Sequence, residues 1–352
     1  MNILFRNTTD FWVPSYVLND TSYLTWWNLP YFILIFFLIF VCCWLTIHMI
    51  IIIWEVRKFH NNANYLISSM YGSWFEGLLG SVLILFYKYG LIDITGSGRI
   101  FEGFEDTENF LKIDKITWKM VPLIVGTFCS WHYLGIVNAG FSMFFFERTL
   151  ATVLLSDYES VPRPKLRIFI IITHHLYALF IAFMMCFHIF PLKKLLGMNA
   201  MGLVFLVPHL IFLQKYNIRA RNRMRLAQNI TKNTLGAKFQ TEENLRSITV
   251  VIRITVMLMI FDIIFLIICF LATIDAPGTR YYFQAVEHFI FFGPLFLVPA
   301  VASSVEDWRK RFLVYIPIQK LRIDPEHNPY AVQESQEETT EIHFLQLQTL
   351  WV

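Results

Sequence analysis

Seven long apolar runs constrain this chain more than any other feature of its sequence. A helix rises roughly 1.5 Å per residue, so about 20 apolar residues cross a hydrocarbon core roughly 30 Å thick. Backbone groups in lipid must be paired within their own segment, which favours helices. The sequence predicts an all-α membrane protein, a seven-transmembrane helix bundle with spans at residues 30–54, 66–87, 120–146, 168–190, 195–213, 248–274 and 285–305.

The composition agrees with a membrane environment. Hydrophobic residues make up 56% of the chain and charged residues 16%, a more apolar balance than the roughly 45–50% of soluble domains. We therefore expect one membrane domain over residues 30–305, preceded by a segment at 1–29 and followed by a polar tail at 306–352. The net charge of +3 is too small and too dispersed to indicate a nucleic acid partner.

Lys and Arg residues are shared unevenly between alternate connecting segments. One set contains the clusters within 57–58, 148–167, 215–246 and 309–322, and the opposite set holds fewer than half as many. Cytoplasmic loops carry the excess of basic residues. This bias predicts an extracellular N-terminus and a cytoplasmic C-terminus. Two Asn-x-Thr sequons, at Asn7 and Asn19, lie in the predicted exterior segment and are candidate glycosylation sites.

The chain lacks the sequence motifs of hydrolases, metalloproteases and nucleotide-binding enzymes. Its five cysteines all fall within apolar stretches, without the spacing of a disulfide framework or a metal site. We therefore predict no catalytic residues, no metal and no cofactor.

Several short motifs carry a resemblance to a known family. Glu147-Arg148-Thr149-Leu150-Ala151-Thr152 is followed by Asp157-Tyr158-Glu159 and then by Pro162-Arg163-Pro164. Further motifs are Phe239-Gln240 with Glu243-Asn244-Leu245-Arg246, and a tail pattern of Thr340, Phe344, Leu347 and Trp351. Together they resemble the nematode serpentine receptor class epsilon (Sre) family, although Thr149 and His343 stand where that family usually has aromatic residues.

This resemblance implies a chemosensory G-protein-coupled receptor. Such a receptor binds a small environmental ligand, activates a heterotrimeric G protein and resides in the plasma membrane, here expected to be the ciliary membrane of sensory neurons. It also implies that the Glu147–Arg148 pair is a switch, in which the acid holds the inactive state and the arginine later contacts the G protein. An acid–Arg pair at a helix end is also an ordinary interfacial anchor.

Four arginines follow the fifth apolar run, and two interpretations fit them. A basic segment beside the membrane is attracted to anionic lipid, by about 1 kcal/mol per residue. The family resemblance instead implies a contact with the G protein. The arginines are Arg219, Arg221, Arg223 and Arg225.

Three ionisable residues fall at mid-membrane depth in the predicted spans. An ionised side chain costs at least about 2.5–3.5 kcal/mol at that depth, so such residues face the bundle interior and are commonly functional. Glu76, His132 and Asp262 are therefore candidates for a ligand pocket. The alternative is that they are neutral or hydrogen-bonded packing residues.

Two other functions are compatible with seven spans. A transporter could use Glu76 and Asp262 to carry a proton or cation, but the sequence lacks the inverted repeats typical of transporters. A ligand-gated channel of the insect odorant-receptor type has the opposite orientation, which the charge bias and the sequons oppose.

Overall fold

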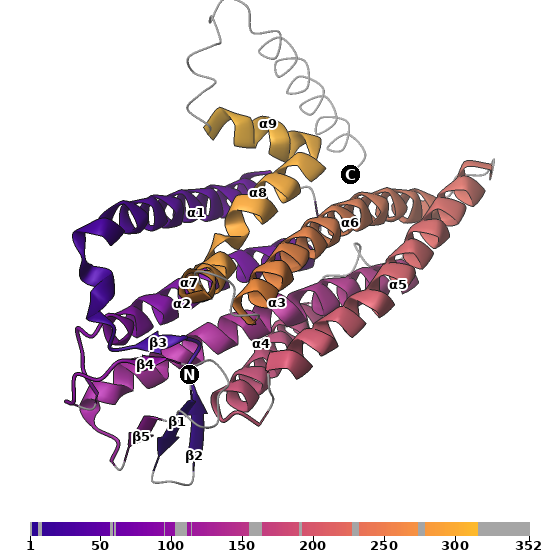
Figure 1. The fold of residues 1–352 in the computed structure, drawn as a ribbon. Helices are drawn as coiled ribbons and strands as arrows, with labels where there is room; N and C mark the ends of the chain where they lie inside the picture. Colours follow the sequence, from indigo (N-terminus) through magenta and orange to yellow (C-terminus); the bar gives the residue numbers. More distant parts are fainter. Residues whose placement is uncertain are drawn as a thin grey trace, which may run out of the picture.

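The fold, shown in Figure 1, comes from a computed structural model of the chain. The structure describes residues 2–5, 9–56, 59, 61–94, 96–102, 111–113, 115–154, 164–189, 192–226, 232–273 and 279–315.

Long helices make up most of the described chain. They are α1 (Leu29–Glu55), α2 (Asn61–Lys88), α3 (Val121–Val153), α4 (Pro164–Cys186), α5 (Leu192–Leu226) and α6 (Lys232–Thr273). A further segment combines α7 (Thr279–Phe289), the 3-10 turn η4 (Ile290–Phe292) and α8 (Gly293–Ser304), and α9 (Glu306–Tyr315) follows it. Shorter 3-10 turns are η1 (Thr21–Leu24), η2 (Trp26–Asn28) and η3 (Trp118–Met120).

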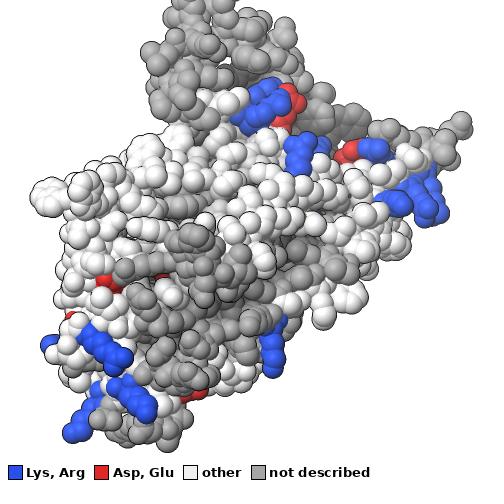
Figure 2. Space-filling view, viewed as in Figure 1, with Lys and Arg blue, Asp and Glu red and all other residues white. Residues whose placement is uncertain are grey.

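The helices have the length and composition of membrane spans. Among the described residues, six helical segments are long and apolar enough to cross a bilayer. The segment outside this set is α5, whose second half is basic. In Figure 2 most visible charged residues lie near the two ends of the molecule, and the surface between them is mainly uncharged. Large apolar side chains of α1 such as Phe36 and Phe40 are exposed, as lipid-facing residues are.

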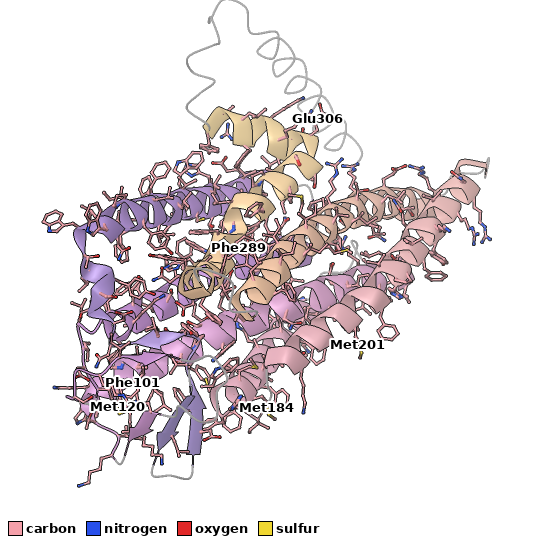
Figure 3. The ribbon with its side chains drawn as sticks, viewed as in Figure 1. Phe101, Met120, Met184, Met201, Phe289 and Glu306 are labelled. Atoms are coloured by element: carbon pink, nitrogen blue, oxygen red, sulfur yellow. The ribbon has the colours of Figure 1, made fainter. Side chains whose placement is uncertain are left out.

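Short strands lie at one end of the bundle. The strands are β1 (Asn2–Phe5), β2 (Thr9–Trp12), β3 (Val17–Leu18), β4 (Phe101–Glu102) and β5 (Leu111–Ile113). β1 pairs antiparallel with β2 and parallel with β5, and β3 pairs antiparallel with β4. We call this end the strand end, and the opposite end, where α9 lies, the tail end (Figure 1). Figure 3 labels Phe101 and Met120 at the strand end and Glu306 at the tail end.

The segment before α1 is thus folded onto the bundle. Residues 1–29 were expected only to be exterior, because hydropathy gives no information on short strands. In the structure Trp12, at the end of β2, is fully buried and stacks on Trp131 of α3, with ring centroids 4.6 Å apart. The Trp131 indole N–H donates to the Trp12 carbonyl oxygen at 3.1 Å. The N-terminal segment therefore packs into the strand end without a disulfide among the described residues.

Helices α5 and α6 extend beyond the apolar runs that predicted them. The fifth run ends at Leu213, whereas α5 continues to Leu226; the sixth begins at Ile248, whereas α6 begins at Lys232. The added turns are rich in Arg, Lys, Leu, Ala and Glu, which favour helix outside lipid as well. Hydropathy detects only the apolar part of a helix, so the described residues between the fifth and sixth apolar runs are helical although no span was predicted there.

Glycines let α2 and α3 approach each other closely. A Cβ atom added to Gly80 of α2 would lie 2.6 Å from the Gly126 carbonyl oxygen and 2.6 Å from the Ser130 hydroxyl oxygen, both in α3. Real Cβ atoms do not approach other atoms this closely. Small residues at such crossings are a general means of helix association in membranes.

Gly80→Ala is therefore expected to destabilise the protein by about 1–3 kcal/mol, the usual cost of overpacking. Gly72→Ala, in the same helix, is the control, because a Cβ there meets no atom within 4 Å. Thermal unfolding of the two purified variants in detergent measures the difference. Equal stability of both variants would contradict the close α2–α3 contact.

Candidate functional site

A cavity opens between the N-terminal segment and the helices at the strand end. Its volume is about 80 Å³, several times the roughly 10–15 Å³ that one water molecule needs. We call it the strand-end cavity, and its walls come from the N-terminal segment, α2, α3, α6, α7 and η4. It is lined by Pro14, Ser15, Ser81, Ile84, Leu85, Lys88, Ser130, Trp131, Tyr133, Leu134, Phe265, Val286, Glu287, His288 and Phe291.

A buried ion pair lies at the edge of this cavity. The Lys88 ammonium group at the end of α2 donates to Oε2 of Glu287 in α7, and the two side chains are only 5% and 12% exposed. The other Glu287 oxygen, Oε1, accepts the backbone N–H of Tyr16 at 2.5 Å. Tyr16 also stacks on Phe283, with ring centroids 3.8 Å apart. These contacts connect α2, α7 and the N-terminal segment at one point.

A second cavity lies deeper in the bundle. It is lined by side chains of α2, α3, α6 and α8, among them Met70, Tyr71 and Pro294. Tyr133 borders both cavities. Phe289 of α7, labelled in Figure 3, stacks on Phe261 of α6 with ring centroids 4.3 Å apart.

A polar network lies near the tail end of α3. Glu147 and Arg148 are almost completely buried, at 0% and 1% exposure. Two guanidinium nitrogens of Arg148, Nε and Nη2, donate to the two carboxylate oxygens of Glu147, each at 2.5 Å. Bidentate pairs of this kind are among the strongest hydrogen-bonded contacts in proteins. The sequence left open whether this pair is a conformational switch or an interfacial anchor, and in the structure both side chains are buried.

Arg148 also connects α3 to α6. Its Nη1 donates to the Ser247 hydroxyl at 3.0 Å and to the Asn244 side-chain oxygen at 3.5 Å. Asn244 and Asn217 of α5 both donate to the Thr152 hydroxyl, at 3.4 and 3.2 Å. We call these groups the Arg148 network: Glu147, Arg148, Thr152, Asn217, Asn244 and Ser247. It joins α3, α5 and α6 through buried polar contacts.

Comparison with known proteins identifies the chain. A family model described as Sre G protein-coupled chemoreceptor matches residues 1–352. The chain belongs to the Sre family. The family resemblance inferred from the short motifs is therefore confirmed, and with it the seven-transmembrane fold class and the chemosensory receptor function. Sre is a family of receptors rather than enzymes.

Curated members of the Sre family align along nearly the whole chain. Serpentine receptor class epsilon-37 of Caenorhabditis elegans is 25% identical, covering 100% of this chain and 100% of its own length. Serpentine receptor class epsilon-38 of the same organism is 25% identical, covering 99% and 100%. Serpentine receptor class epsilon-26 is 24% identical, covering 98% of each. No solved structure matches the chain.

Two of the three mid-membrane candidates, Glu76 and His132, contact each other. Glu76 Oε1 lies 2.8 Å from His132 Nδ1, and the His132 ring stacks on that of His175 in α4, with centroids 5.7 Å apart. Neither Glu76 nor His132 lines the two cavities described above. Asp262 belongs to α6, and its side chain lies outside the described part of the structure.

The arginines at the end of α5 differ in their surroundings. Arg219 and Arg223 are exposed, whereas Arg221 Nη1 lies 3.7 Å from Oε2 of Glu242 in α6. The Arg225 side chain is outside the described part of the structure. The arginines at 219 and 223 are thus available to lipid or to a protein partner.

The structure describes only one of the two candidate glycosylation sites. Asn7 lies outside the described residues. Asn19 is 8% exposed, has a positive φ of 65°, and donates from Nδ2 to the Arg99 carbonyl oxygen at 3.4 Å. A glycan on this nitrogen would have to replace that buried contact. Glycosylation of Asn19 stays a prediction that requires a different arrangement of this turn.

The sequence did not predict which residues pair with each other, either in the Lys88–Glu287 ion pair or in the Arg148 network. Lys88 was counted only as an exterior basic residue, and Glu287 received no role. The sequence signal for Glu287 was that an acid lies near the start of the last apolar run, at 285–305. Asn217 and Ser247 were assigned to a loop, because α5 and α6 were expected to end at the membrane.

Proposed function

We propose that the strand end of the bundle faces the extracellular side of the plasma membrane and that the tail end faces the cytoplasm. The excess of Lys and Arg in the segments at the tail end supports this orientation. Exposure of Arg219 and Arg223 on the last turns of α5 is compatible with it. For a chemosensory receptor, the ciliary membrane of a sensory neuron is the proposed location.

In this orientation a small environmental ligand binds in the strand-end cavity. The cavity lies at the strand end and is lined by five separate elements of the bundle and by the N-terminal segment. A ligand bound between helices changes the relative free energies of the different arrangements of those helices. Glu76, His132 and Asp262 are proposed to modify the response to ligand, and Glu76→Gln tests this part of the proposal through the ligand dose response.

The Arg148 network is the observation that carries the coupling mechanism. With Arg148 bonded to Glu147 and to Ser247, α6 is held against α3 and the guanidinium group is buried. Ligand binding shifts the equilibrium towards a state in which α6 moves away and these bonds open. Arg148 and the arginines of α5 then contact a heterotrimeric G protein. The ligand must bind this state more tightly, since equal affinity for both states shifts nothing.

Ser247→Ala tests the mechanism without any ligand. The substitution removes one hydrogen bond of the charged Arg148 side chain, a contact worth about 1.5–3 kcal/mol. Because about 1.4 kcal/mol changes an equilibrium tenfold, basal G protein activation is expected to rise at least about tenfold. Nucleotide exchange on a heterotrimeric G protein, measured with the full-length receptor in lipid nanodiscs, gives the value.

Thr249→Ala is the matched control for this experiment. It removes a hydroxyl two residues away in α6, whose bond to the Leu245 carbonyl oxygen stays within the helix. Its basal activity should equal that of the wild type. A basal rate for Ser247→Ala no higher than that of Thr249→Ala would exclude the α3–α6 contact as a restraint on the inactive state.

A further inference from the structure

The strand-end cavity has an apolar body and a small polar rim. Its walls include Ile84, Leu85, Leu134, Phe265 and Val286 together with the rings of Trp131, Tyr133 and Phe291. Apolar walls with a few placed polar groups are typical of sites for small organic molecules. Most of a ligand's surface in this cavity would therefore contact hydrocarbon.

The formal charges that face the cavity cancel. Lys88 and Glu287 carry opposite charges and are bonded to each other. A ligand with a net charge would leave one charge in excess in a site with few polar groups. Burial of an unpaired charge is costly. The cavity therefore disfavours both carboxylate and ammonium compounds.

Two polar groups at the cavity have a hydrogen-bond donor to offer: the Lys88 ammonium group, which can only donate, and the Ser130 hydroxyl, which can donate or accept. The Lys88 ammonium group has three N–H bonds, and within the described part of the structure it contacts Glu287 Oε2 and the face of the Tyr89 ring, 5.8 Å away. The Ser130 hydroxyl is buried and has no hydrogen-bond partner among the described residues. Both oxygens of Glu287 already accept a donor, from Lys88 and from the Tyr16 backbone.

We propose that the ligand of this receptor is an uncharged, mainly apolar compound with a hydrogen-bond-accepting oxygen of the ketone or ester type. The oxygen accepts from Lys88 or Ser130, and the hydrocarbon part fills the apolar body of the cavity. This inference rests on the proposed assignment of the ligand to the strand-end cavity. It adds a chemical class that the family membership does not supply.

The test compares four straight-chain series that share the same carbon numbers: methyl ketones, alkanes, carboxylates and primary amines. Nucleotide exchange on a G protein is measured for the full-length receptor in nanodiscs at neutral pH. Methyl ketones are expected to activate, alkanes to activate at higher concentration, and the two charged series to be inactive. Ser247→Ala, measured without ligand in the same assay, reports whether the receptor couples at all.

A pair of variants assigns the response to the cavity. Ser130→Ala should weaken the ketone response about threefold to tenfold, the range for one hydrogen bond between neutral groups. The response to alkanes should be unchanged. Ser73→Ala is the control, because its hydroxyl bonds the Met70 carbonyl oxygen at 2.8 Å and lines neither cavity described.

Each other outcome overturns the proposal. Activation by carboxylates or amines at concentrations equal to or below those of the ketones would show that the site accepts net charge. Alkanes as potent as ketones would exclude a role for the donors. If no series activates while Ser247→Ala is active, the ligand class is wrong and the coupling mechanism stands. If Ser247→Ala is silent too, the proposed function fails as well.

Discussion

Replacement of Arg148 by alanine is expected to abolish G protein activation while the receptor still reaches the cell surface. Arg148 is the side chain proposed to enter the interface with the G protein when α6 moves, and alanine has no group to replace the guanidinium. Loss of Arg148 alone leaves the Glu147 carboxylate buried without its main partner, which costs about 3–5 kcal/mol. The measurement therefore uses Glu147→Gln/Arg148→Ala, which removes both charges.

Glu147→Gln alone is the informative contrast. It keeps Arg148 and its bond to Ser247 but removes the charge that holds the guanidinium group in α3. Basal nucleotide exchange should rise, whereas the double variant should show neither basal nor stimulated exchange. Surface staining of both variants controls for delivery. Normal signalling by the double variant would remove Arg148 from the mechanism.

Glu287→Leu is expected to destabilise the folded receptor by about 3–5 kcal/mol. The substitution leaves the Lys88 ammonium group 5% exposed and without its carboxylate, and an uncompensated buried charge has this cost. It also removes the acceptor of the Tyr16 backbone N–H, so the N-terminal segment should loosen. Free energies of unfolding in detergent measure the effect.

Two further variants show whether the buried charge of Lys88 causes the expected loss of stability in Glu287→Leu. Lys88→Leu/Glu287→Leu should recover most of the lost stability, since replacement of both partners of a buried pair is often nearly neutral. Glu55→Leu breaks an exposed pair with Arg311 at the tail end, whose side chains are 41% and 45% exposed. An exposed pair contributes about 0–1 kcal/mol. A loss for Glu287→Leu as small as that for Glu55→Leu would contradict burial of the strand-end pair.

The spans of the bundle could be predicted because lipid imposes a simple requirement on sequence. A segment such as 30–54 must be apolar throughout, and α1 covers Leu29–Glu55. The same requirement says nothing about helix outside lipid. The ends of α5 and α6, with Asn217 and Asn244, therefore could not be distinguished from a basic loop by hydropathy.

The candidate sites were predictable only in part. The motif at Glu147-Arg148 marked one end of the Arg148 network, since the family resemblance singled it out. The α6 partners of Arg148 lie 96 and 99 residues further along the chain, and pairing over such distances depends on the packed bundle. The same holds for Lys88 and Glu287, which are 199 residues apart. Neither residue follows a local pattern that separates a buried pair from two interfacial charges.

The packing of the N-terminal segment against the helices was the least predictable feature of the fold. Trp12 and Tyr16 belong to a short mixed segment that has neither the length of a span nor a regular alternation. Their ring contacts with Trp131 of α3 and Phe283 of α7 join parts of the chain more than 100 residues apart, which no local pattern indicates.

The orientation of the chain in the membrane tests the account most directly, because the ligand site and the coupling site are proposed to lie on opposite sides. Epitope tags at both ends of the full-length receptor are stained in intact cells and again after permeabilisation, and a glycosidase shift is scored for Asn7→Gln against the wild type. We predict an amino-terminal tag accessible in intact cells, a carboxyl-terminal tag stained only after permeabilisation, and a shift that depends on Asn7. The reverse staining would place Arg148 outside the cell and contradict coupling to a G protein.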